Sequence, residues 1–576
     1  MPSTLVSRVQ QALAAGRPDL AWSALVADET LPHDQDALQL LVALGLKNGQ
    51  AKNVLAHLSH AIELNPEQPR LLALYAALLH ETGDKQAAAR YSARALALDP
   101  GNDIAASLLT ETLADNLQIS AAIQVSETCL QRRPRAWGVR LARTFAWMAA
   151  GEAARALMDA EMARNAAPHS IAARQNSAMA SLYLDEPAAE TIHRHRSIAG
   201  EIPPLKGMSM SARAAYRRGS RPLRIGFVSP DLRRHPVGDF IAPVFAHLDP
   251  TRAQAFVYND AVGDARTQLL RARIAHWLDT HKWTDAKLFQ QIQHDRIDVL
   301  IDLAGYTNGA RPSLFATRCA PVQIGYLGYL HPTCLAAMDA LLGDAFTLAT
   351  ASWPGGETPL KLDRHLLCFE PSTHAPPIAM REGGPTRFGS FNHLAKLSPA
   401  TVRLWARLLK ETPDANLTLC ALGLGDAGVR HAIQRRFAAE GCDPGRLRLL
   451  PPETDPARFL ARYGDIDLAL DPLPFNGGTT SLQALWQGVP VLTLPGERMA
   501  ARIGGSLLQA LQMEDYIAND EDDYVRIGSR FDAAAMSTRV LRNSLRKRMH
   551  DAGLTDGRAF TDNMLEVIET FSASDT

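Results

Sequence analysis

A short glycine- and hydroxyl-rich stretch in the C-terminal half of the chain has the residue types of an anion-binding site. In residues 475–490, FNGGTTSLQALWQGVP, two glycines, two threonines and a serine stand directly before an apolar helical pattern. Unpaired N–H groups and the positive end of the helix dipole attract anions at such a helix start. Gly477 and Gly478 let the backbone approach a ligand closely. Phosphate is therefore the predicted occupant, and the alternative is an ordinary Thr or Ser N-cap after a flexible turn.

A second loop supplies a cation. The stretch FGSFNHLAKLSPATVRLW, residues 388–405, predicts a strand, a loop carrying His393 and Lys396, and a helix that begins at a Ser-Pro pair. If this loop and the helix beginning near Thr479 lie at the mouth of one sheet, the lysine can neutralise a diphosphate held by that helix. The alternative is a solvated surface charge.

A third candidate motif is rejected. Gly423, Gly425 and Gly428 have the G-x-G-x-x-G spacing of a dinucleotide-binding turn. They follow an internal strand rather than the first strand of their domain. The acidic residue at about the right distance, Glu453, stands beside two prolines. We therefore expect no bound dinucleotide at this turn.

The elements that position these loops are strands alternating with helices. After about residue 205, short apolar runs end in turn residues and are separated by helical patterns, first over residues 221–329 and again over 387–496. Alternation of this kind predicts parallel sheets with helices on both faces. The Pro- and Gly-rich stretch 373–387 is interpreted as a hinge or linker. We expect two α/β domains in series, with ligands outside the carboxyl ends of their strands.

The N-terminal third has a different organisation, a repeat of 34 residues. Prolines recur at this interval, small residues stand five positions before each proline, and glycines stand 17 positions before three of them: Pro32, Pro66, Pro100, Pro134 and Pro168; Ala27, Ala61, Ala95, Cys129 and Ala163; Gly49, Gly83 and Gly151. A flexible break, a close helix contact and a helix-ending proline describe a helical hairpin. The pattern resembles the tetratricopeptide repeat.

About five repeats cover residues 1–170, and a weaker sixth runs from 171 to 204. Stacked helix pairs form a superhelix whose concave face commonly binds an extended peptide or another protein. The alternative is a rigid spacer or a dimerisation surface.

Length, charge and the distribution of apolar residues and cysteines indicate which partners and which cellular compartment to expect. The chain has 576 residues, enough for about three or four domains, and its 60 basic and 61 acidic residues give a formal charge of -1. We expect no nucleic-acid partner that depends on a strong positive field. The N-terminus lacks an apolar signal core and no stretch is long enough for a membrane span, so we expect a cytoplasmic protein. The six cysteines are scattered and predict neither disulfides nor a zinc site.

Four ordered motifs carry a resemblance to a known family. They are SPDLRRHPVGDF (229–240), DLAGYTNGARPSLFATRCAPVQIGYLGY (302–329), SFNHLAKLSP (390–399) and LDPLPFNGGTTSLQALWQGVPVLTLPG (470–496). Together with the repeats, they resemble the O-linked N-acetylglucosamine transferases of glycosyltransferase family 41, in a bacterial form. The resemblance implies a tetratricopeptide-repeat superhelix (1–204) followed by a glycosyltransferase-B fold of two Rossmann-like α/β lobes (205–380 and 381–576).

The resemblance also implies an activity and its residues. Family members transfer N-acetylglucosamine from UDP-GlcNAc to Ser or Thr of proteins with inversion, without a metal or other cofactor, so a UDP-sugar and polypeptide acceptors are the expected partners. The implied catalytic residues are His235, as a general base or as a positioning group, and Lys396. The implied donor contacts are His393, Lys396, Phe459, Asn476, Gly477, Gly478, Thr479 and Thr480.

The chemistry agrees with these roles. Departure of a nucleoside diphosphate builds negative charge on the β-phosphate, which fixed N–H groups and an ammonium stabilise in place of a metal. The consecutive acidic residues 520–523 are interpreted as a solvated helix start rather than as metal ligands.

Several positions depart from the family pattern. Phe459 replaces the usual histidine that stacks on the uracil, Gly478 and Gln483 replace a histidine and an acid, and YLHPTC (329–334) replaces a Y-P-G-T loop. These changes affect ribose contacts and sugar identity. The alternatives are therefore a related transferase that uses a fucose or glucose donor, or a repeat scaffold with an inactive transferase domain.

The pattern of the C-terminal segment, residues 541–571, predicts one or two amphipathic helices. The resemblance implies that the last helix returns to the first lobe.

Overall fold

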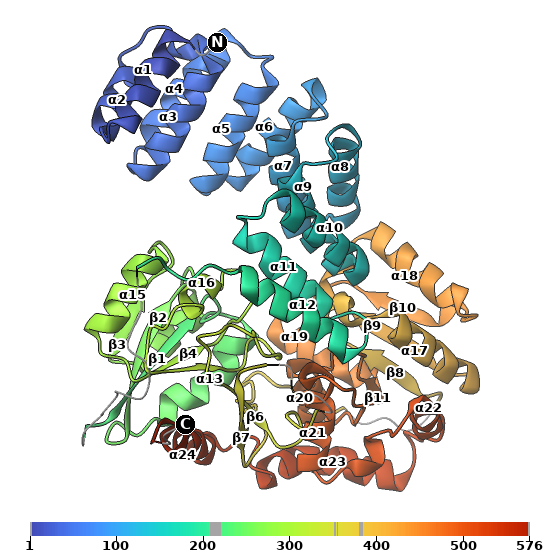
Figure 1. The fold of residues 1–576 in the computed structure, drawn as a ribbon. Helices are drawn as coiled ribbons and strands as arrows, with labels where there is room; N and C mark the ends of the chain where they lie inside the picture. The colour runs from blue at the N-terminus through green and yellow to red at the C-terminus, as the bar shows by residue number, and fades with distance from the viewer. Residues whose placement is uncertain (1–2, 208–220, 351–352, 354, 380–383, 574–576) are drawn as a thin grey trace. The chain divides into compact units, whose positions relative to one another are not determined.

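The computed structural model describes residues 3–207, 221–350, 353, 355–379 and 384–573 (Figure 1). The chain forms two compact units. The first contains Met1–Ala150, Arg155–Ala173 and Asp426–Val429, and the second contains the remainder. The second unit thus includes the last helical hairpin of the repeat region together with both sheets.

The repeat region is a series of antiparallel helix pairs (Figure 1). Its helices are α1 (Thr4–Ala14), α2 (Pro18–Val26), α3 (Gln35–Lys47), α4 (Ala51–Leu64), α5 (Pro69–Glu81), α6 (Lys85–Leu98), α7 (Asp103–Asp115), α8 (Ile119–Arg132), α9 (Trp137–Ala150), α10 (Ala153–Ala166), α11 (Ile171–Ser181) and α12 (Ala188–Glu201). The predicted helical hairpins are confirmed, with one pair per 34-residue period.

The spaced glycines end the first helix of their pairs. Gly49, Gly83 and Gly151 have φ angles of 68°, 95° and 78°, the left-handed conformation of a helix C-terminus. Leu117, at the same position of the repeat frame, also has a positive φ of 59°. This conformation costs a non-glycine residue roughly 1–2 kcal/mol, so the repeat packing imposes the turn even where the sequence lacks glycine.

The small residues of the frame pack as expected, with one exception. Ala61, Ala95, Cys129 and Ala163 are fully buried on the second helices of their pairs. Ala27 is exposed because α2 ends at Val26. Pro66, Pro100, Pro134 and Pro168 come just after the ends of their helices, as predicted, whereas Pro32 lies beyond the end of α2 in a separate 3-10 turn, Leu31–His33.

Within the described residues, the first sheet, of the N-terminal lobe, has seven parallel strands in the order β3-β2-β1-β4-β5-β6-β7. They are β1 (Leu223–Ser229), β2 (Ala253–Asn259), β3 (His276–Asp279), β4 (Val299–Asp302), β5 (Val322–Gly325), β6 (Ala340–Asp344) and β7 (Thr358–Leu362). The helices of this lobe are α13 (Pro236–His247), α14 (Ala265–Arg271), α15 (Asp285–His294) and α16 (Pro312–Phe315).

In the part of the C-terminal lobe that the structure describes, the second sheet has five parallel strands in the order β10-β9-β8-β11-β12. They are β8 (Arg387–Ser390), β9 (Asn416–Cys420), β10 (Leu447–Leu450), β11 (Leu468–Leu470) and β12 (Val491–Leu492). Its helices are α17 (Pro399–Glu411), α18 (Ala427–Ala439), α19 (Pro456–Ala461), α20 (Thr479–Trp486), α21 (Ile503–Ala510), α22 (Glu521–Ser529), α23 (Met536–Asp551) and α24 (Gly557–Ala573).

The nine strands expected from apolar runs are present, and three others were missed. These are β3 and β7, which form the edges of the first sheet, and β6, which lies between β5 and β7. β3 and β7 mix polar with apolar residues and are partly exposed, which an edge strand allows, and β7 contains Pro359. The stretch 373–379 has no regular structure, and residues 380–383 of the predicted linker lie outside the described residues.

The C-terminal segment forms two helices, as predicted. α24 packs on α13 of the first lobe, where the Arg252 guanidinium lies 2.8 Å from a Glu569 carboxylate oxygen. The acidic run at 520–523 begins α22, with the Asp520 carboxylate accepting from the Asp523 backbone N–H. Both sequence interpretations are confirmed.

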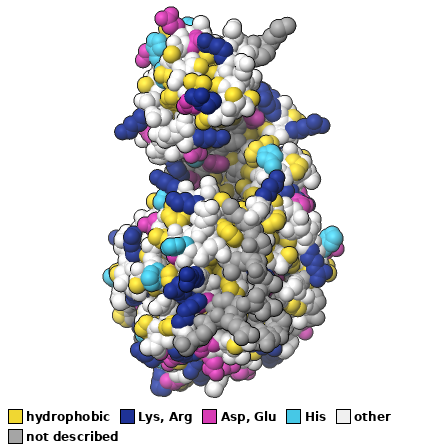
Figure 2. Space-filling model, turned by 60° about the vertical axis from the view of Figure 1, so that its left-hand side comes forward, with side chains coloured by type: hydrophobic (Ala, Val, Ile, Leu, Met, Phe, Trp, Pro, Cys, Tyr) yellow, Lys and Arg dark blue, Asp and Glu magenta, His cyan; other side chains and the backbone are white. Residues whose placement is uncertain are grey.

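Charge on the visible face is mixed. In Figure 2, Lys and Arg side chains are interspersed with Asp and Glu side chains. Within the described parts of the chain, no helix is both long and apolar enough to cross a membrane.

Candidate active site at the switch points of the two sheets

The candidate residues lie where the strand order of each sheet reverses. In the second sheet the chain runs outward from β8 through β9 to β10, then returns to the other side of β8 with β11. The loops after adjacent strands β8 and β11 therefore leave in opposite directions, and a crevice opens between them. The first loop carries Lys396 and the second leads into α20. In the first sheet, β1 and β4 form the equivalent point, and His235 follows β1.

Hydrogen bonds to buried groups fix the loop before α20. The buried Asp471 carboxylate accepts hydrogen bonds from the Gly477 backbone N–H (2.6 Å) and the Thr493 hydroxyl (2.7 Å). The Asn476 amide donates to the Pro472 carbonyl at 2.9 Å. The helix N-cap is Gly478, which supplies no capping side chain. The first turn of α20 is thus rigidly placed, and no N-cap side chain competes with an anion for its N–H groups.

The two glycines of this loop have different steric surroundings, and this difference predicts different mutational effects. A Cβ on Gly477 would overlap Ser481 Oγ and approach Thr480 Oγ1 to 2.8 Å, whereas a Cβ on Gly478 meets nothing closer than Leu367 Cδ1 at 3.5 Å. Gly477→Ala should destabilise the second unit by ~1–3 kcal/mol. Gly478→Ala, the matched control, should stay within about 0.5 kcal/mol of wild type. Thermal unfolding measures both, and equal midpoints for the two variants would contradict the assignment.

Lys396 joins the two loops of the crevice. Its ammonium donates to the Asn476 carbonyl at 2.7 Å and lies 4.3 Å from the centre of the Phe475 ring. Desolvation lowers the pKa of Lys396 to about 8, partly opposed by the Asp471 carboxylate. Burial raises the pKa of Asp471 to about 6, opposed by its hydrogen bonds and by Lys396. The structure thus brings Lys396 to the loop that begins α20, through the carbonyl of Asn476.

The hydroxyl of Thr480 has a structural partner. It donates to the Asn392 side-chain oxygen at 2.8 Å, which ties α20 to the loop after β8. In this state its proton is not directed at a ligand. Thr479, one residue earlier, lines the cavity described next. Of the two threonines, Thr479 is therefore the candidate hydroxyl donor.

A cavity of about 750 Å³ lies between the two lobes. From the C-terminal lobe it is lined by Phe459, Thr479, Gln483 and Trp486. The Phe459 ring packs against Phe391 at a centroid distance of 6.0 Å. This size suits a small organic ligand. His235, His393, Lys396 and Asn476–Gly478 do not line this cavity. His393 instead caps the short helical turn before Lys396, accepting from the Ala395 N–H through Nδ1 at 3.1 Å.

Two cations that were not predicted from the sequence, Arg234 and Arg266, line the cavity from the N-terminal lobe. Arg266 is paired with Asp239 and with Glu370, at 3.1 Å in both cases. Arg234 is exposed and reaches across to the Thr454 carbonyl at 3.0 Å. The signal that could have identified it is its position directly before His235 in the first motif.

His235 is the N-cap of α13. Its Nδ1 accepts from the Val237 N–H at 3.3 Å and lies 3.9 Å from an Asp231 carboxylate oxygen. Desolvation lowers the pKa of His235, and the Asp231 carboxylate opposes that shift. The imidazole is therefore neutral at neutral pH. With Nδ1 accepting, Nε2 carries the proton; a base at Nε2 needs the other tautomer, with Nδ1–H directed at Asp231.

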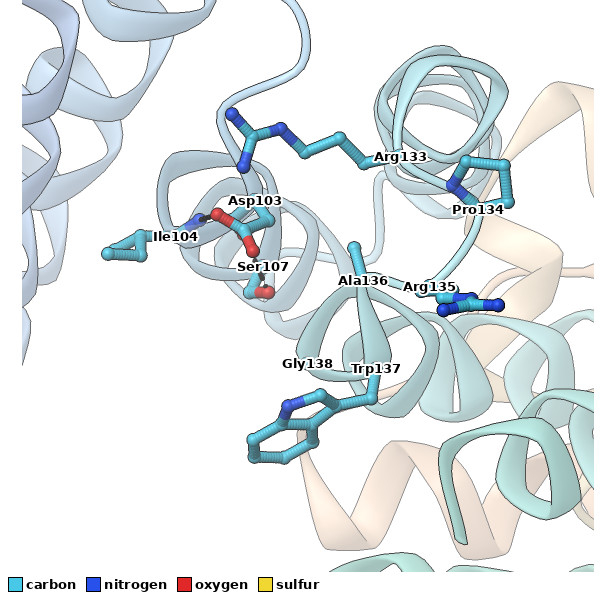
Figure 3. Close-up of a pocket in the computed structure, with 9 residues that line it drawn as sticks. All are labelled: Asp103, Ile104, Ser107, Arg133, Pro134, Arg135, Ala136, Trp137 and Gly138. Atoms are coloured by element: carbon cyan, nitrogen blue, oxygen red, sulfur yellow. Dashed lines mark hydrogen bonds between the residues drawn. The ribbon is translucent and has the colours of Figure 1, made fainter. Parts of the chain in front are cut away.

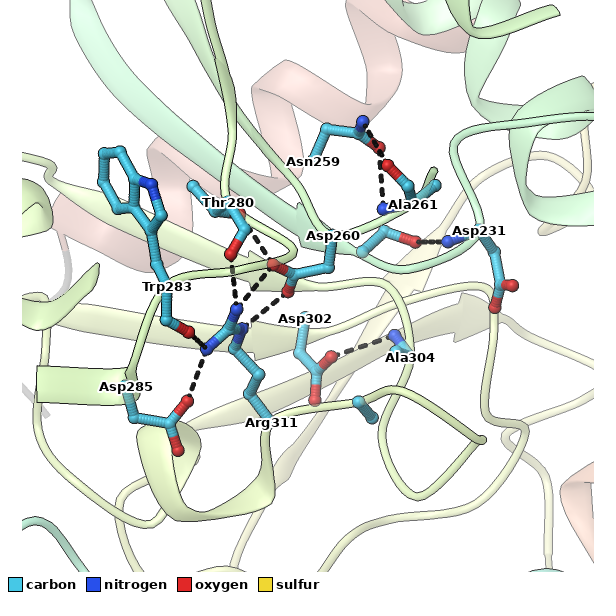
Figure 4. A network of polar contacts seen from close by, with 12 residues as sticks. Asp231, Asn259, Asp260, Ala261, Thr280, Trp283, Asp285, Asp302, Ala304 and Arg311 are labelled. Carbon is cyan, nitrogen blue, oxygen red and sulfur yellow. Dashed lines mark hydrogen bonds and ion pairs between the residues drawn. The ribbon is translucent and has the colours of Figure 1, made fainter. Parts of the chain in front are cut away.

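The second motif has a structural role at the edge of the first sheet (Figure 4). The Arg311 guanidinium binds the Asp260 carboxylate through two bonds of 2.7 and 2.8 Å and lies 2.7 Å from Asp285. It thereby joins the loops that follow β2 and β3. Asp302, at the end of β4, accepts from the Ala304 and Gly305 N–H groups, and burial raises its pKa to about 6.

Buried side chains hold the YLHPTC loop (329–334) in place. The carboxylate of Glu357 accepts from the Thr333 N–H and hydroxyl, both at 2.7 Å. The buried His331 ring packs on His195 of α12 at a centroid distance of 4.1 Å. This loop therefore contacts the last repeat helix rather than standing free.

The described residues contain no group of three or more His, Cys, Asp or Glu side chains arranged to hold a metal ion. Asp465 and Asp467 have D-x-D spacing, but Asp467 is paired with Arg387 at 2.9 Å and Asp465 with Arg448 at 3.2 Å. The Gly423–Gly425 turn is a short 3-10 segment after β9, which lies inside the sheet rather than at its switch point.

Two doubly wound lobes, with an amide and ammonium site at the switch point of the second, form the glycosyltransferase-B class of fold. The family model described as glycosyl transferase family 41 matches residues 204–352 and 385–564 of this chain. This chain belongs to glycosyl transferase family 41.

Individual relatives agree. The chain is 32% identical over 408 residues to a Solanum lycopersicum protein named probable UDP-N-acetylglucosamine–peptide N-acetylglucosaminyltransferase SPINDLY, covering 69% of this chain and 44% of that protein. It is 28% identical over 353 residues to the Arabidopsis thaliana protein of the same descriptive name designated SEC, covering 56% and 34%. The chain thus spans less than half the length of these curated relatives.

A solved structure of a mutant Thermobaculum terrenum O-GlcNAc transferase is also similar. Its TM-score is 0.80 at 29% sequence identity, covering 88% of this chain and 97% of that chain.

Proposed function

We propose that this protein is an inverting, metal-independent glycosyltransferase that moves N-acetylglucosamine from UDP-GlcNAc to Ser or Thr of proteins. The observation that carries the proposal is the meeting of Lys396 with the loop that begins α20. An ammonium and a helix N-terminus at one switch point suit the diphosphate that departs in the reaction.

In this proposal the uracil packs on Phe459, and Thr479 and the first turn of α20 bind the diphosphate. Negative charge that develops on the β-phosphate is stabilised by these N–H groups and by Lys396, without a metal. The acceptor hydroxyl attacks the face of the sugar opposite the leaving diphosphate, which inverts the anomeric centre.

His235 is the proposed general base. After the imidazole changes tautomer, Nδ1–H is directed at Asp231, and Nε2 accepts the proton of the acceptor hydroxyl. The same Asp231 carboxylate stabilises the imidazolium that forms. The pKa shift toward the neutral form keeps the base ready at neutral pH.

Incubation of the protein with radiolabelled UDP-GlcNAc and a cell lysate tests the donor and the acceptor class together. We expect label in protein, released by base under conditions that cleave Ser- and Thr-linked sugars. The same assay with chelator should give equal label. If no sugar nucleotide labels protein, the remaining explanation is a repeat scaffold with an inactive transferase domain.

A related donor sugar is the second candidate. Gln483 lines the cavity, and Gly478, which precedes Thr479 as the N-cap of α20, has no side chain. Both residues differ from those that the family pattern has at the positions for ribose and sugar contacts. Transfer from a fucose or glucose nucleotide, with none from UDP-GlcNAc, would favour this alternative.

The repeats supply the proposed docking site for the polypeptide acceptor. A cavity of about 690 Å³ lies at the N-terminal ends of α7 and α9 (Figure 3). Two large apolar side chains at this site, Ile104 and Trp137, are 37% and 39% exposed. Arg133 and Arg135, also exposed, line it. An extended acceptor with acidic residues beside an apolar side chain matches this combination.

Trp137→Ala should raise the KM for protein acceptors about thirtyfold, because exposed tryptophans at interfaces commonly contribute roughly 2 kcal/mol or more. Phe145→Ala is the matched control, since Phe145 is 50% exposed on the same helix but does not line the cavity. Donor affinity, measured by calorimetry with UDP, should be unchanged in both. Equal effects of the two substitutions would rule out docking at this cavity.

A further inference from the structure

The segment that connects α11 to α12, residues 182–187, makes three contacts with the C-terminal lobe. Two are with the phosphate-site loops, which run from β8 to α17 and from β11 to α20, and the third is with Arg498 after β12. Its Tyr183 ring is stacked on Phe475, with centroids 5.0 Å apart and planes within 10°. The Asp185 carboxylate accepts from the Ala400 N–H at 2.7 Å. The Leu184 carbonyl accepts from the Arg498 guanidinium at 2.6 Å. All of these residues belong to the second compact unit.

The stacked ring of Phe475 also contacts Lys396. Phe475, which Tyr183 covers, is the ring beneath the Lys396 ammonium, and Asn476, the next residue, accepts the hydrogen bond of that ammonium. A cation over an aromatic ring gains roughly 0.5–2 kcal/mol, more when water is excluded. Tyr183 is partly buried and blocks movement of the Phe475 ring toward the repeat side.

The carboxylate contact fixes the chain on the other side of Lys396. Ala400 is the second residue of α17, which begins three residues after the lysine. Its N–H is one of the donors that a helix leaves unpaired at its start. Asp185 satisfies that donor and places a negative charge at the positive end of the helix dipole. One short segment of the last hairpin therefore braces both loops that hold the ammonium.

Arg498 anchors this segment. Its buried guanidinium also donates to the Thr191 hydroxyl at 3.0 Å and to the Ser181 carbonyl at 3.3 Å. Three oxygen partners on the α11–α12 hairpin hold the connecting turn against the C-terminal lobe. The hairpin is thus part of the transferase core by its contacts, although it continues the sequence pattern of the repeats.

We propose that Tyr183 is a positioning residue for Lys396, acting through the Phe475 ring, so that the last repeat hairpin is an integral part of the donor-phosphate site. This assignment rests on the proposed function for its effect on turnover, but its packing component is independent of that function. Loss of the Tyr183 ring frees Phe475, admits water beside the ammonium and loosens its bond to the Asn476 carbonyl.

The test compares Tyr183→Ala and Tyr183→Phe in the full-length chain. Tyr183→Ala should lower kcat about tenfold to a hundredfold, the range for a misplaced catalytic group. It should also move the alkaline limb of the kcat/KM profile upward, because a more hydrated Lys396 holds its proton to higher pH. Tyr183→Phe retains the ring and should behave as wild type. Tyr91→Ala, which removes a tyrosine that packs edge-to-face on Tyr75 within the repeats, is the control and should change neither.

A second measurement separates this proposal from the proposed function. The pH dependence of acylation of Lys396 by acetic anhydride, followed by mass spectrometry, reports its pKa without turnover. The midpoint should rise in Tyr183→Ala and stay unchanged in Tyr183→Phe. An unchanged midpoint in folded Tyr183→Ala, or an equal rise in both variants, would overturn the assignment. If the wild-type protein has no transferase activity but the Lys396 midpoint still rises in Tyr183→Ala, only the proposed function is refuted.

Discussion

Lys396→Ala should lower glycosyl transfer by about 10²–10³-fold. The charge stabilisation lost is ~3–4 kcal/mol, the range for removal of one preorganised donor to a developing anion. Its ammonium is fixed by the Asn476 carbonyl at 2.7 Å and is partly desolvated, so its charge acts at short range with little screening. Steady-state kinetics with saturating acceptor measure the effect, which should appear mainly in kcat.

The matched control is Lys410→Ala, which removes an exposed lysine at the end of α17. It should leave kcat and KM near their wild-type values. Lys396→Arg retains the charge but not the compact ammonium, and should recover only part of the activity. A loss of tenfold or less in Lys396→Ala would make the lysine peripheral to the reaction.

His235→Ala should lower kcat by roughly 10²–10⁴-fold, the usual contribution of a general base, while the Kd for UDP stays unchanged. The reason is that His235 follows β1 of the opposite lobe, and the first turn of α20 and Lys396 hold the diphosphate without it. The acid limb of the wild-type kcat profile should lie below pH 6.5, since desolvation lowers the pKa of His235 and protonation removes the base. That limb should disappear in the variant.

Two further variants separate a base from a positioning donor. His235→Asn retains an N–H donor without a titratable nitrogen, and Asp231→Asn removes the carboxylate 3.9 Å from Nδ1. A base that Asp231 orients predicts low kcat in both variants. Near-normal turnover in His235→Asn would show instead that the imidazole only positions a substrate. His193→Ala, on the exposed face of α12, is the control.

Much of the architecture was predictable because its signals are local. A proline every 34 residues and a small residue five positions earlier define each helical pair, and the buried Ala61 and Cys129 show the same packing role for different side chains. Apolar runs identify most of the strands because both faces of a parallel strand are buried. β3 and β7, at the edges of the first sheet, mix polar with apolar residues and were not predicted, and the buried strand β6 was not predicted either.

The phosphate-site loops were predictable for a related reason. Residues that follow β8 and β11 must meet if the two strands are neighbours in one sheet, and the glycines and lysine stand directly after those strands. The sequence did not distinguish the two threonines. Only the contact with Asn392 shows that the Thr480 hydroxyl donates within the protein, whereas Thr479 lines the cavity.

By itself the amino-acid sequence determined the repeats, the two α/β lobes and the residues at the carboxyl ends of their strands, because periodicity and turn chemistry act over a few residues. The tertiary structure alone decided which distant groups meet: Tyr183 with Phe475, Arg234 with the opposite lobe, and Asp471 with the loop it fixes. Such contacts depend on how whole elements pack, and packing satisfies shape, burial and hydrogen bonds jointly over the entire unit. No local pattern of residues encodes that joint solution.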